Sequence, residues 1–129
     1  MATPDWDLTQ VQKFYGEFAE KYDSDVSPDT YPAPFIIGKW TLAHLQSHSS
    51  VLSTAEHAHP KRFCVLDLGC GTGQSSKAFF APPSGMICEV YGTDATPEML
   101  KKAKSLPFQS LALQPAEAPL PFEVVFDAV

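Results

Sequence analysis

The stretch VLDLGCGTGQSS, residues 65–76, decides the fold, because an apolar run leads straight into three closely spaced glycines. The chain has seven glycines, and three of them, Gly69, Gly71 and Gly73, lie within five residues. Glycine has no Cβ and readily adopts positive φ, so a ligand can approach the main chain there. A helix that follows such a loop aims its unpaired N–H groups beyond the end of the strand. We therefore predict a strand–loop–helix unit with a ligand site at the loop.

The glycine spacing distinguishes two kinds of nucleotide site. A dinucleotide fingerprint reads G-x-G-x-x-G, whereas this loop reads G-x-G-x-G, with Gly73 one residue early. Asp67 precedes the loop, where a carboxylate would repel a diphosphate and attract a cation. A ligand with an ammonium group near Asp67, a carboxylate near Gln74 and a ribose would suit this site. A nicotinamide-dependent oxidoreductase is disfavoured and stays open as an alternative.

The next apolar run ends in YGTDAT, residues 91–96, and Asp94 comes 21 residues after Gly73. A spacing of about 20 residues is typical of an acid that meets a ribose diol in a βαβ unit. The carboxylate would accept two hydroxyl hydrogens, and each charge-assisted bond would contribute roughly 1.5–3 kcal/mol. Asp94 is the strongest single ligand candidate. The alternative is that it only stabilises the N-terminus of a helix beginning near Thr96.

From residue 63 onward, apolar runs alternate with helical patterns, as is typical of βαβ units and a mostly parallel sheet. Thr96 is the expected N-cap of the second helix of this region, with Pro97 in its first turn. We predict strands over 63–68, 87–93, 109–113 and 124–129, and helices over about 74–80 and about 97–104.

Two further helices are predicted upstream. Residues 7–22 carry apolar side chains at steps of three and four, which predicts an amphipathic helix of about four turns. A second helix is predicted from Pro34 to about His44. Residues 46–62 are expected to form a loop, at most with a short helix.

Composition and charge narrow the range of partners. A chain of 129 residues predicts one domain, and 9 basic against 15 acidic residues give a formal charge of -6. This charge disfavours nucleic acid and anionic membrane surfaces. The N-terminus lacks an apolar signal segment, and no apolar run approaches about 18 residues, so we expect a cytoplasmic protein.

Neither a disulfide framework nor a metal site is expected. The three cysteines form no CxxC pair, which favours reduced thiols. His44 and His48 are four residues apart but lack a supporting carboxylate cluster, so we predict no metal.

Taken together, VLDLGCGTG (65–73) and YGTDATPEML (91–100) resemble the first two motifs of class I S-adenosylmethionine-dependent methyltransferases. LQPAEAPLPFEVVFDAV (113–129) resembles the third block of that family, so the resemblance covers roughly residues 63–129. It implies a Rossmann-like α/β fold, S-adenosyl-L-methionine as the cofactor, and methyl transfer to an acceptor. The negative charge favours a small-molecule or protein acceptor over nucleic acid. It also implies a helical lid and lead-in over 1–62 and the N-terminal half of the methyltransferase domain over 63–129.

The resemblance also assigns roles around the glycine loop. Asp67 would orient the methionine end of the cofactor, and Asp94 would hold the ribose. Ala95 would pack against the adenine. The loop beneath the methionine end would consist of Gly69, Cys70, Gly71 and Gly73.

One position departs from the family pattern. Members usually carry an Asp before the AE pair, whereas this chain has Pro115, which offers neither a carboxylate nor an N–H group. Adenine recognition would then shift to the Ala116 backbone or to Glu117, and a plain surface role for Glu117 is an equal alternative. Tyr15 or Tyr22 of the first helix would serve as a lid over the cofactor or, alternatively, pack in the core.

The resemblance makes the lack of a nucleophile motif understandable. S-adenosylmethionine carries its own activated methyl group, so the protein mainly has to align an acceptor and exclude water. No catalytic residue is assigned. A noncatalytic binding module stays open as a second alternative.

The family's sheet has seven strands, of which this chain would hold about four, so we expect a C-terminally truncated version of the fold. The fourth, with Val124, Val125, Phe126 and Val129, would lie beside the first as an edge strand with unpaired backbone groups. We therefore expect low stability and self-association through the open sheet edge.

Overall fold

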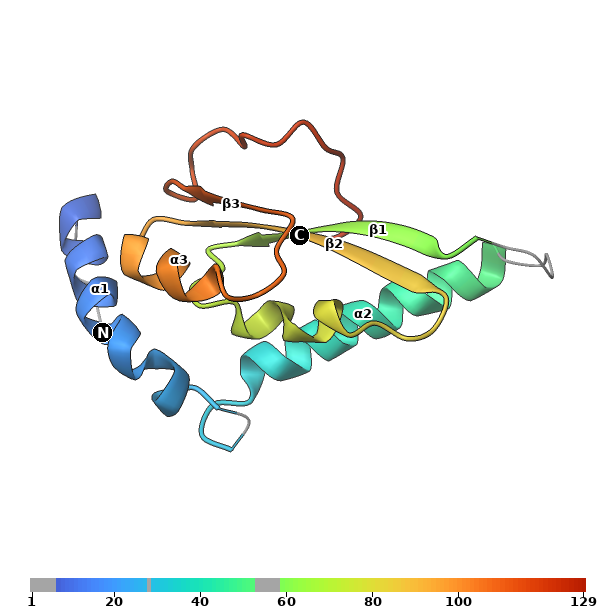
Figure 1. The fold of residues 1–129 in the computed structure, drawn as a ribbon, viewed down its shortest axis with the longest axis horizontal. Coiled ribbons are helices and arrows are strands. Elements are labelled where there is room, and N and C mark those ends of the chain that lie inside the picture. The colour runs from blue at the N-terminus through green and yellow to red at the C-terminus, as the bar shows by residue number, and fades with distance from the viewer. Residues whose placement is uncertain (1–6, 28, 53–58) are drawn as a thin grey trace.

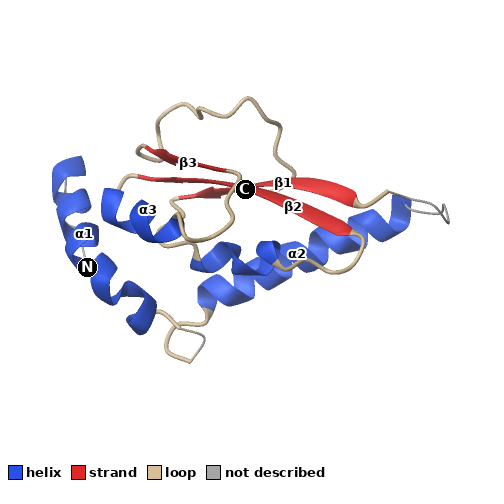
Figure 2. Cartoon of the chain, viewed as in Figure 1, coloured by secondary structure: helices blue, strands red, loops and turns tan. Residues whose placement is uncertain are grey.

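The computed structural model describes residues 7–27, 29–52 and 59–129. A parallel three-stranded sheet carries helices on one face, and the chain after the last strand passes over the other face (Figures 1 and 2). This arrangement confirms the predicted α/β class. The elements are α1 (Leu8–Asp25), α2 (Ala33–Leu52), β1 (Lys61–Leu68), the 3-10 helix η1 (Gln74–Phe80), β2 (Met86–Asp94), α3 (Pro97–Ala103) and β3 (Ser110–Leu113).

The sheet has the order β1-β2-β3, and both pairings are parallel. Val65 of β1 is in register with Val90 of β2, and Gly92 of β2 is in register with Leu111 of β3. Parallel strands end at the same edge of a sheet, and ligands bind beyond that edge in open α/β sheets. The loop after β1 and the end of β2 therefore meet at one place, as the sequence predicts.

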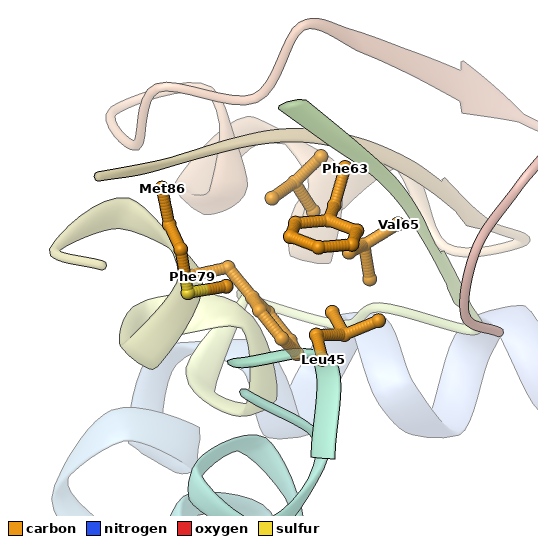
Figure 3. Packing of buried hydrophobic residues seen from close by; sticks show 6 residues of the cluster. Leu45, Phe63, Val65, Phe79 and Met86 are labelled. Carbon is orange, nitrogen blue, oxygen red and sulfur yellow. The ribbon is translucent and has the colours of Figure 1, made fainter. Parts of the chain in front are cut away.

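The core lies between the sheet and the helices α2 and η1 (Figure 3). Burial of one such apolar side chain contributes roughly 1.5–3 kcal/mol to the free energy of folding. This cluster therefore stabilises the packing of α2 and η1 against the sheet. Its buried members are Leu45, Phe63, Val65, Phe79, Met86 and Val90.

The two N-terminal helices are longer than predicted. Asp7 caps α1, because its side chain accepts a hydrogen bond from the Gln10 backbone N–H while the Gln10 side chain accepts one from the Asp7 N–H. The second helix runs to Leu52 rather than His44, so the loop prediction for 46–62 is wrong over 46–52. That segment has no glycine or proline to end the helix. Residues 53–58 lie outside the described part.

The predicted fourth strand, 124–129, is wrong as a strand, although it lies beside β1 as expected. A single parallel bridge joins Val65 to Ala128. Asp127 explains why the pairing stops, because its carboxylate accepts from the Cys64 backbone N–H at 2.8 Å. The Cys64 N–H group therefore binds the Asp127 side chain and is not available to a backbone carbonyl of the last segment, which a continued strand pairing would require.

The face of the sheet opposite the helices carries an aromatic cluster. Tyr91 points away from the core because it alternates with Val90 along β2. Its ring lies 5.1 Å from the ring of Phe122 and 5.5 Å from that of Phe126. Val125 and Val129 stay 91% and 82% exposed, so the last segment only partly covers this side.

No helix in the described part of the chain is long and apolar enough to cross a bilayer.

Candidate functional site

A cavity of about 530 Å³ lies beyond the carboxyl edge of the sheet. Its volume is in the range of small-molecule sites. Four segments form its wall, namely α1, the glycine loop, the end of β2 with the start of α3, and the chain after β3. The lining residues are Leu8, Val11, Tyr15, Tyr22, Gly69, Gly71, Asp94, Ala95, Thr96, Met99, Gln114, Pro115, Ala116 and Glu117.

Two of the three loop glycines face the cavity. Gly69 and Gly71 have φ of 72° and 57°, where side chains are strained. A Cβ built at either position would meet no atom within 4 Å, so both glycines border open space. The loop thus leaves room for a ligand against its main chain.

Gly73 has a different reason to be glycine. Its φ is 94°, and a Cβ there would lie 2.7 Å from a Leu106 methyl carbon and 3.0 Å from the Phe108 ring. Gly73 does not line the cavity, so packing against the segment after α3 accounts for it. Its proposed place in the cofactor loop stays a prediction.

The Asp94 carboxylate is held by backbone donors on both oxygens. One oxygen accepts from the Gly71 N–H at 2.8 Å, and the other accepts from the Thr96 N–H at 2.9 Å. A carboxylate has about four lone-pair positions, so each oxygen can accept another hydrogen bond on the cavity side. The Thr96 side chain makes no capping bond, and Asp94 takes over that task. Asp94 therefore stabilises the start of α3, as the alternative interpretation expected, and its ribose contact stays a prediction.

Asp67 does not line this cavity. Its carboxylate accepts from the Ser76 hydroxyl at 2.6 Å and borders a smaller cavity of about 80 Å³ with Val65, Ser76 and Ala128. Burial raises the pKa of Asp67, the Ser76 hydrogen bond lowers it, and the charge of Asp94 raises it further. The prediction that Asp67 meets an ammonium group stays untested.

Substitution Asp67→Asn should stabilise the protein, and more so at neutral than at acid pH. Because the folded-state pKa of Asp67 is raised above that of the unfolded chain, its contribution to stability is present at low pH and is lost as the pH rises through the folded-state value. Urea unfolding at about pH 4 and about pH 7 measures this. The gain of the variant over the wild type should be larger at pH 7. Equal gains at both pH values would contradict the buried-charge explanation.

Cys70 is buried below the loop, with 7% of its surface exposed. Burial, followed by the charges of Asp67 and Asp94, raises the pKa of its thiol strongly. The raised pKa keeps the group a neutral thiol near pH 7, which is the poorly nucleophilic form of cysteine. It does not line the cavity, so its cofactor role remains a prediction.

Helix α1 forms the outer wall. The Gln12 side chain donates to the Ala95 carbonyl at 2.8 Å, which fixes the helix beside the end of β2. Tyr15 and Tyr22 line the cavity, and Tyr15 is 42% exposed, so it is not a core residue. Burial raises the pKa of the Tyr22 hydroxyl, which keeps it protonated at neutral pH.

The segment after β3 closes the remaining side. Pro115, Ala116 and Glu117 line the cavity, so the structure brings the two adenine candidates to the same place as Asp94 and Ala95. Gln114 lines it too and was missed by sequence reasoning. Its backbone N–H donates to the Asp94 carbonyl at 3.0 Å. The only sequence signal for Gln114 is its place next to Pro115.

The described residues contain no group of three or more His, Cys, Asp or Glu side chains that could hold a metal ion. The rings of His44 and His48 on α2 have their centroids 4.8 Å apart and their planes tilted by 39°, and neither residue lines the cavity.

Comparison with known proteins identifies the domain family of this chain. The family model of the methyltransferase domain matches residues 65–129, which is half of the chain. This chain belongs to the methyltransferase domain family. The matched part of the methyltransferase domain begins within β1 and includes the glycine loop, Asp94 and the chain after β3. No curated protein matches the chain in sequence.

A solved methyltransferase shares the fold of this chain at low sequence identity. Magnesium protoporphyrin IX methyltransferase from Synechocystis PCC 6803, solved with bound S-adenosylmethionine, is 16% identical, with a TM-score of 0.50 over 88% of this chain and 57% of that chain. The plantazolicin methyltransferase BpumL, solved in complex with a monoazolic desmethylPZN analogue and S-adenosylhomocysteine, is 17% identical, with a TM-score of 0.49 over 93% of this chain and 48% of that chain. The chain thus spans about half the length of these two proteins.

Proposed function

We propose that this chain binds S-adenosyl-L-methionine in the 530 Å³ cavity and belongs to an enzyme that transfers its methyl group. One observation carries the proposal. The N–H groups of Gly71 and Thr96 hold the two carboxylate oxygens of Asp94 in place. Each oxygen keeps a lone pair that can accept a hydrogen bond from a diol. The glycine loop beside this carboxylate borders open space. The hydrogen-bond acceptors of Asp94 and the open space before the loop fit an adenosyl ligand.

The residues would divide the ligand among them. Asp94 would accept hydrogen bonds from the ribose hydroxyls, and the main chain at Gly69 and Gly71 would pass beneath the methionine end. Ala95 and Met99 would flank the adenine, with the Ala116 backbone or Glu117 reaching its edge. The bound cofactor would supply the activated methyl group.

The chain's own residues would bind, orient and exclude water. The apolar side chains of Leu8 and Val11 from α1 cover the cavity and would keep water from the reacting centre. Asp67 lies outside the cavity wall and would act on the methionine end only through the loop and its electrostatic field. No residue of the described part is assigned as a general base.

The finer assignments rest on sequence. We infer that residues 1–62 serve as lead-in and lid and that 63–129 form the N-terminal half of the methyltransferase domain, in the cytoplasm. FYGEFAEKYDSDV (14–26) and YPAP (31–34) resemble the lead-in of the Williams-Beuren syndrome region methyltransferase-like protein 27, which we propose as the nearest kin. The acceptor would be a small molecule or a protein, since a net charge of -6 disfavours nucleic acid.

Calorimetric titration with S-adenosylmethionine, S-adenosylhomocysteine and NAD tests the proposal. We expect saturable binding of both sulfur ligands and none of NAD, because the contracted glycine loop departs from the spacing of a dinucleotide site. Binding of NAD alone would refute the proposed function and favour an oxidoreductase. Binding of the sulfur ligands without methyl transfer to any acceptor would leave a noncatalytic binding module.

A further inference from the structure

A polar clamp joins the C-terminal part of α1 to the glycine loop. One oxygen of the Asp23 carboxylate accepts from the Thr72 hydroxyl at 2.7 Å and from the Gln74 side-chain amide at 2.5 Å. These residues are 49 and 51 positions away in sequence. Thr72 and Gln74 flank Gly73, so the clamp holds the end of the loop that leads into η1.

The two donors of the clamp are buried. Thr72 is 4% and Gln74 is 7% exposed, whereas Asp23 is exposed. Buried donors need partners, and hydrogen bonds to a carboxylate are stronger than bonds between neutral groups. An exposed residue of α1 therefore satisfies two polar groups that the loop itself cannot pair.

Helix α1 has little apolar packing to hold it in place. Of its residues, all of them described, only Ala19 is buried. The helix nevertheless supplies Leu8, Val11, Tyr15 and Tyr22 to the cavity wall. Two long-range polar attachments hold it, at Gln12 and at Asp23. Beside the contact of α1 with α3, these hydrogen bonds therefore help to position this wall of the cavity.

We infer that Asp23 is a positioning residue for ligand binding, which holds α1 against the glycine loop and so keeps two walls of the cavity in register. This inference rests on the proposed function. Asp23 itself does not line the cavity, so it acts through α1 and the loop. Loss of its carboxylate should free the α1 wall and leave the Thr72 and Gln74 donors without their partner.

The test compares Asp23→Ala with Asp25→Ala, which removes the same charge from the same helix outside the clamp. We expect the dissociation constant for S-adenosylhomocysteine to rise about 10-fold in Asp23→Ala, mostly through faster dissociation, and to stay within about 2-fold in Asp25→Ala. Asp23→Asn should be intermediate, because its one carbonyl oxygen can still accept. Surface plasmon resonance gives both rate constants.

A second measurement does not need the ligand. Backbone amides of α1 should exchange hydrogen faster in ligand-free Asp23→Ala, which removes both bonds of the clamp, and less so in Thr72→Val, which removes one of them. The double variant should bind about as weakly as Asp23→Ala alone, because that substitution already removes the acceptor of the Thr72 hydroxyl. Unchanged exchange together with unchanged dissociation in Asp23→Ala would overturn the inference. If the wild type bound no adenosyl ligand, the proposed function would fail, and the exchange of α1 would still decide whether the clamp exists.

Discussion

Substitution Asp94→Ala is expected to weaken the binding of S-adenosylhomocysteine by at least about 100-fold. Two charge-assisted hydrogen bonds of roughly 1.5–3 kcal/mol each would be lost, and about 1.4 kcal/mol corresponds to a factor of ten in affinity. The variant also removes the acceptor from the Gly71 and Thr96 N–H groups. The loop and the start of α3 would then lose the group that joins them. Isothermal calorimetry measures the affinity.

Two further variants separate charge from shape. In Asp94→Asn, both neighbours are N–H donors, so the amide nitrogen must face one of them, and we expect an intermediate loss of affinity. Glu123→Gln removes a charge from an exposed position outside the cavity and should change affinity by less than about 2-fold. A circular dichroism melt excludes simple unfolding. Unchanged affinity in a folded Asp94→Ala protein would show that the ribose lies elsewhere.

Substitution Gly38→Ala should lower the free energy of unfolding by about 2 kcal/mol. A Cβ at this position would lie 2.5 Å from the Ser75 backbone carbonyl oxygen, so α2 would have to move away from η1. Neither helix backbone can yield without disturbing the core cluster between them and the sheet. The helix-propensity gain of alanine over glycine, about 1 kcal/mol, offsets only part of this cost. Urea unfolding followed by circular dichroism measures the difference.

Gly16→Ala is the matched control, since Gly16 also lies inside a helix and gains the same propensity. Its Cβ would lie 2.8 Å from a carboxylate oxygen of Glu98, the far end of a flexible side chain that can rotate away. We expect this variant to be neutral or up to about 1 kcal/mol more stable. Equal stability changes in the two variants would contradict the close approach of α2 to η1.

Much of the fold could be predicted because short-range patterns report it. The apolar runs predicted β1, β2 and β3 to within two residues at every end, and Thr96 with Pro97 predicted the start of α3. The pattern failed at 124–129, since a strand needs backbone partners along its length and Asp127 ends the pairing with its side chain. The pattern also failed at 46–52, which was predicted as a loop because it has few apolar side chains. The segment continues α2, since it contains no glycine or proline that would end the helix.

Only part of the candidate site could be predicted from the sequence. Asp94 and the loop glycines could be selected as candidates from residue type and spacing. Positive φ at a glycine and the distance in sequence from the loop to the next acid are local properties of the chain. The clamp of Asp23 with Thr72 and Gln74 joins residues about 50 positions apart, and no local pattern announces it. Gln114 and Met99 likewise line the cavity only because separate segments converge there.

By itself, the sequence determined the α/β class, the glycine loop at the end of β1 and the acid at the end of β2, because strand periodicity, backbone freedom and charge are properties of neighbouring residues. Only the tertiary structure decided which loop residues face the cavity. It turned Gly69 and Gly71 toward open space, Gly73 toward Leu106, and Asp67 toward Ser76. The surroundings of each of these residues depend on segments distant in the chain, and those contacts form only when the sheet and the helices have packed.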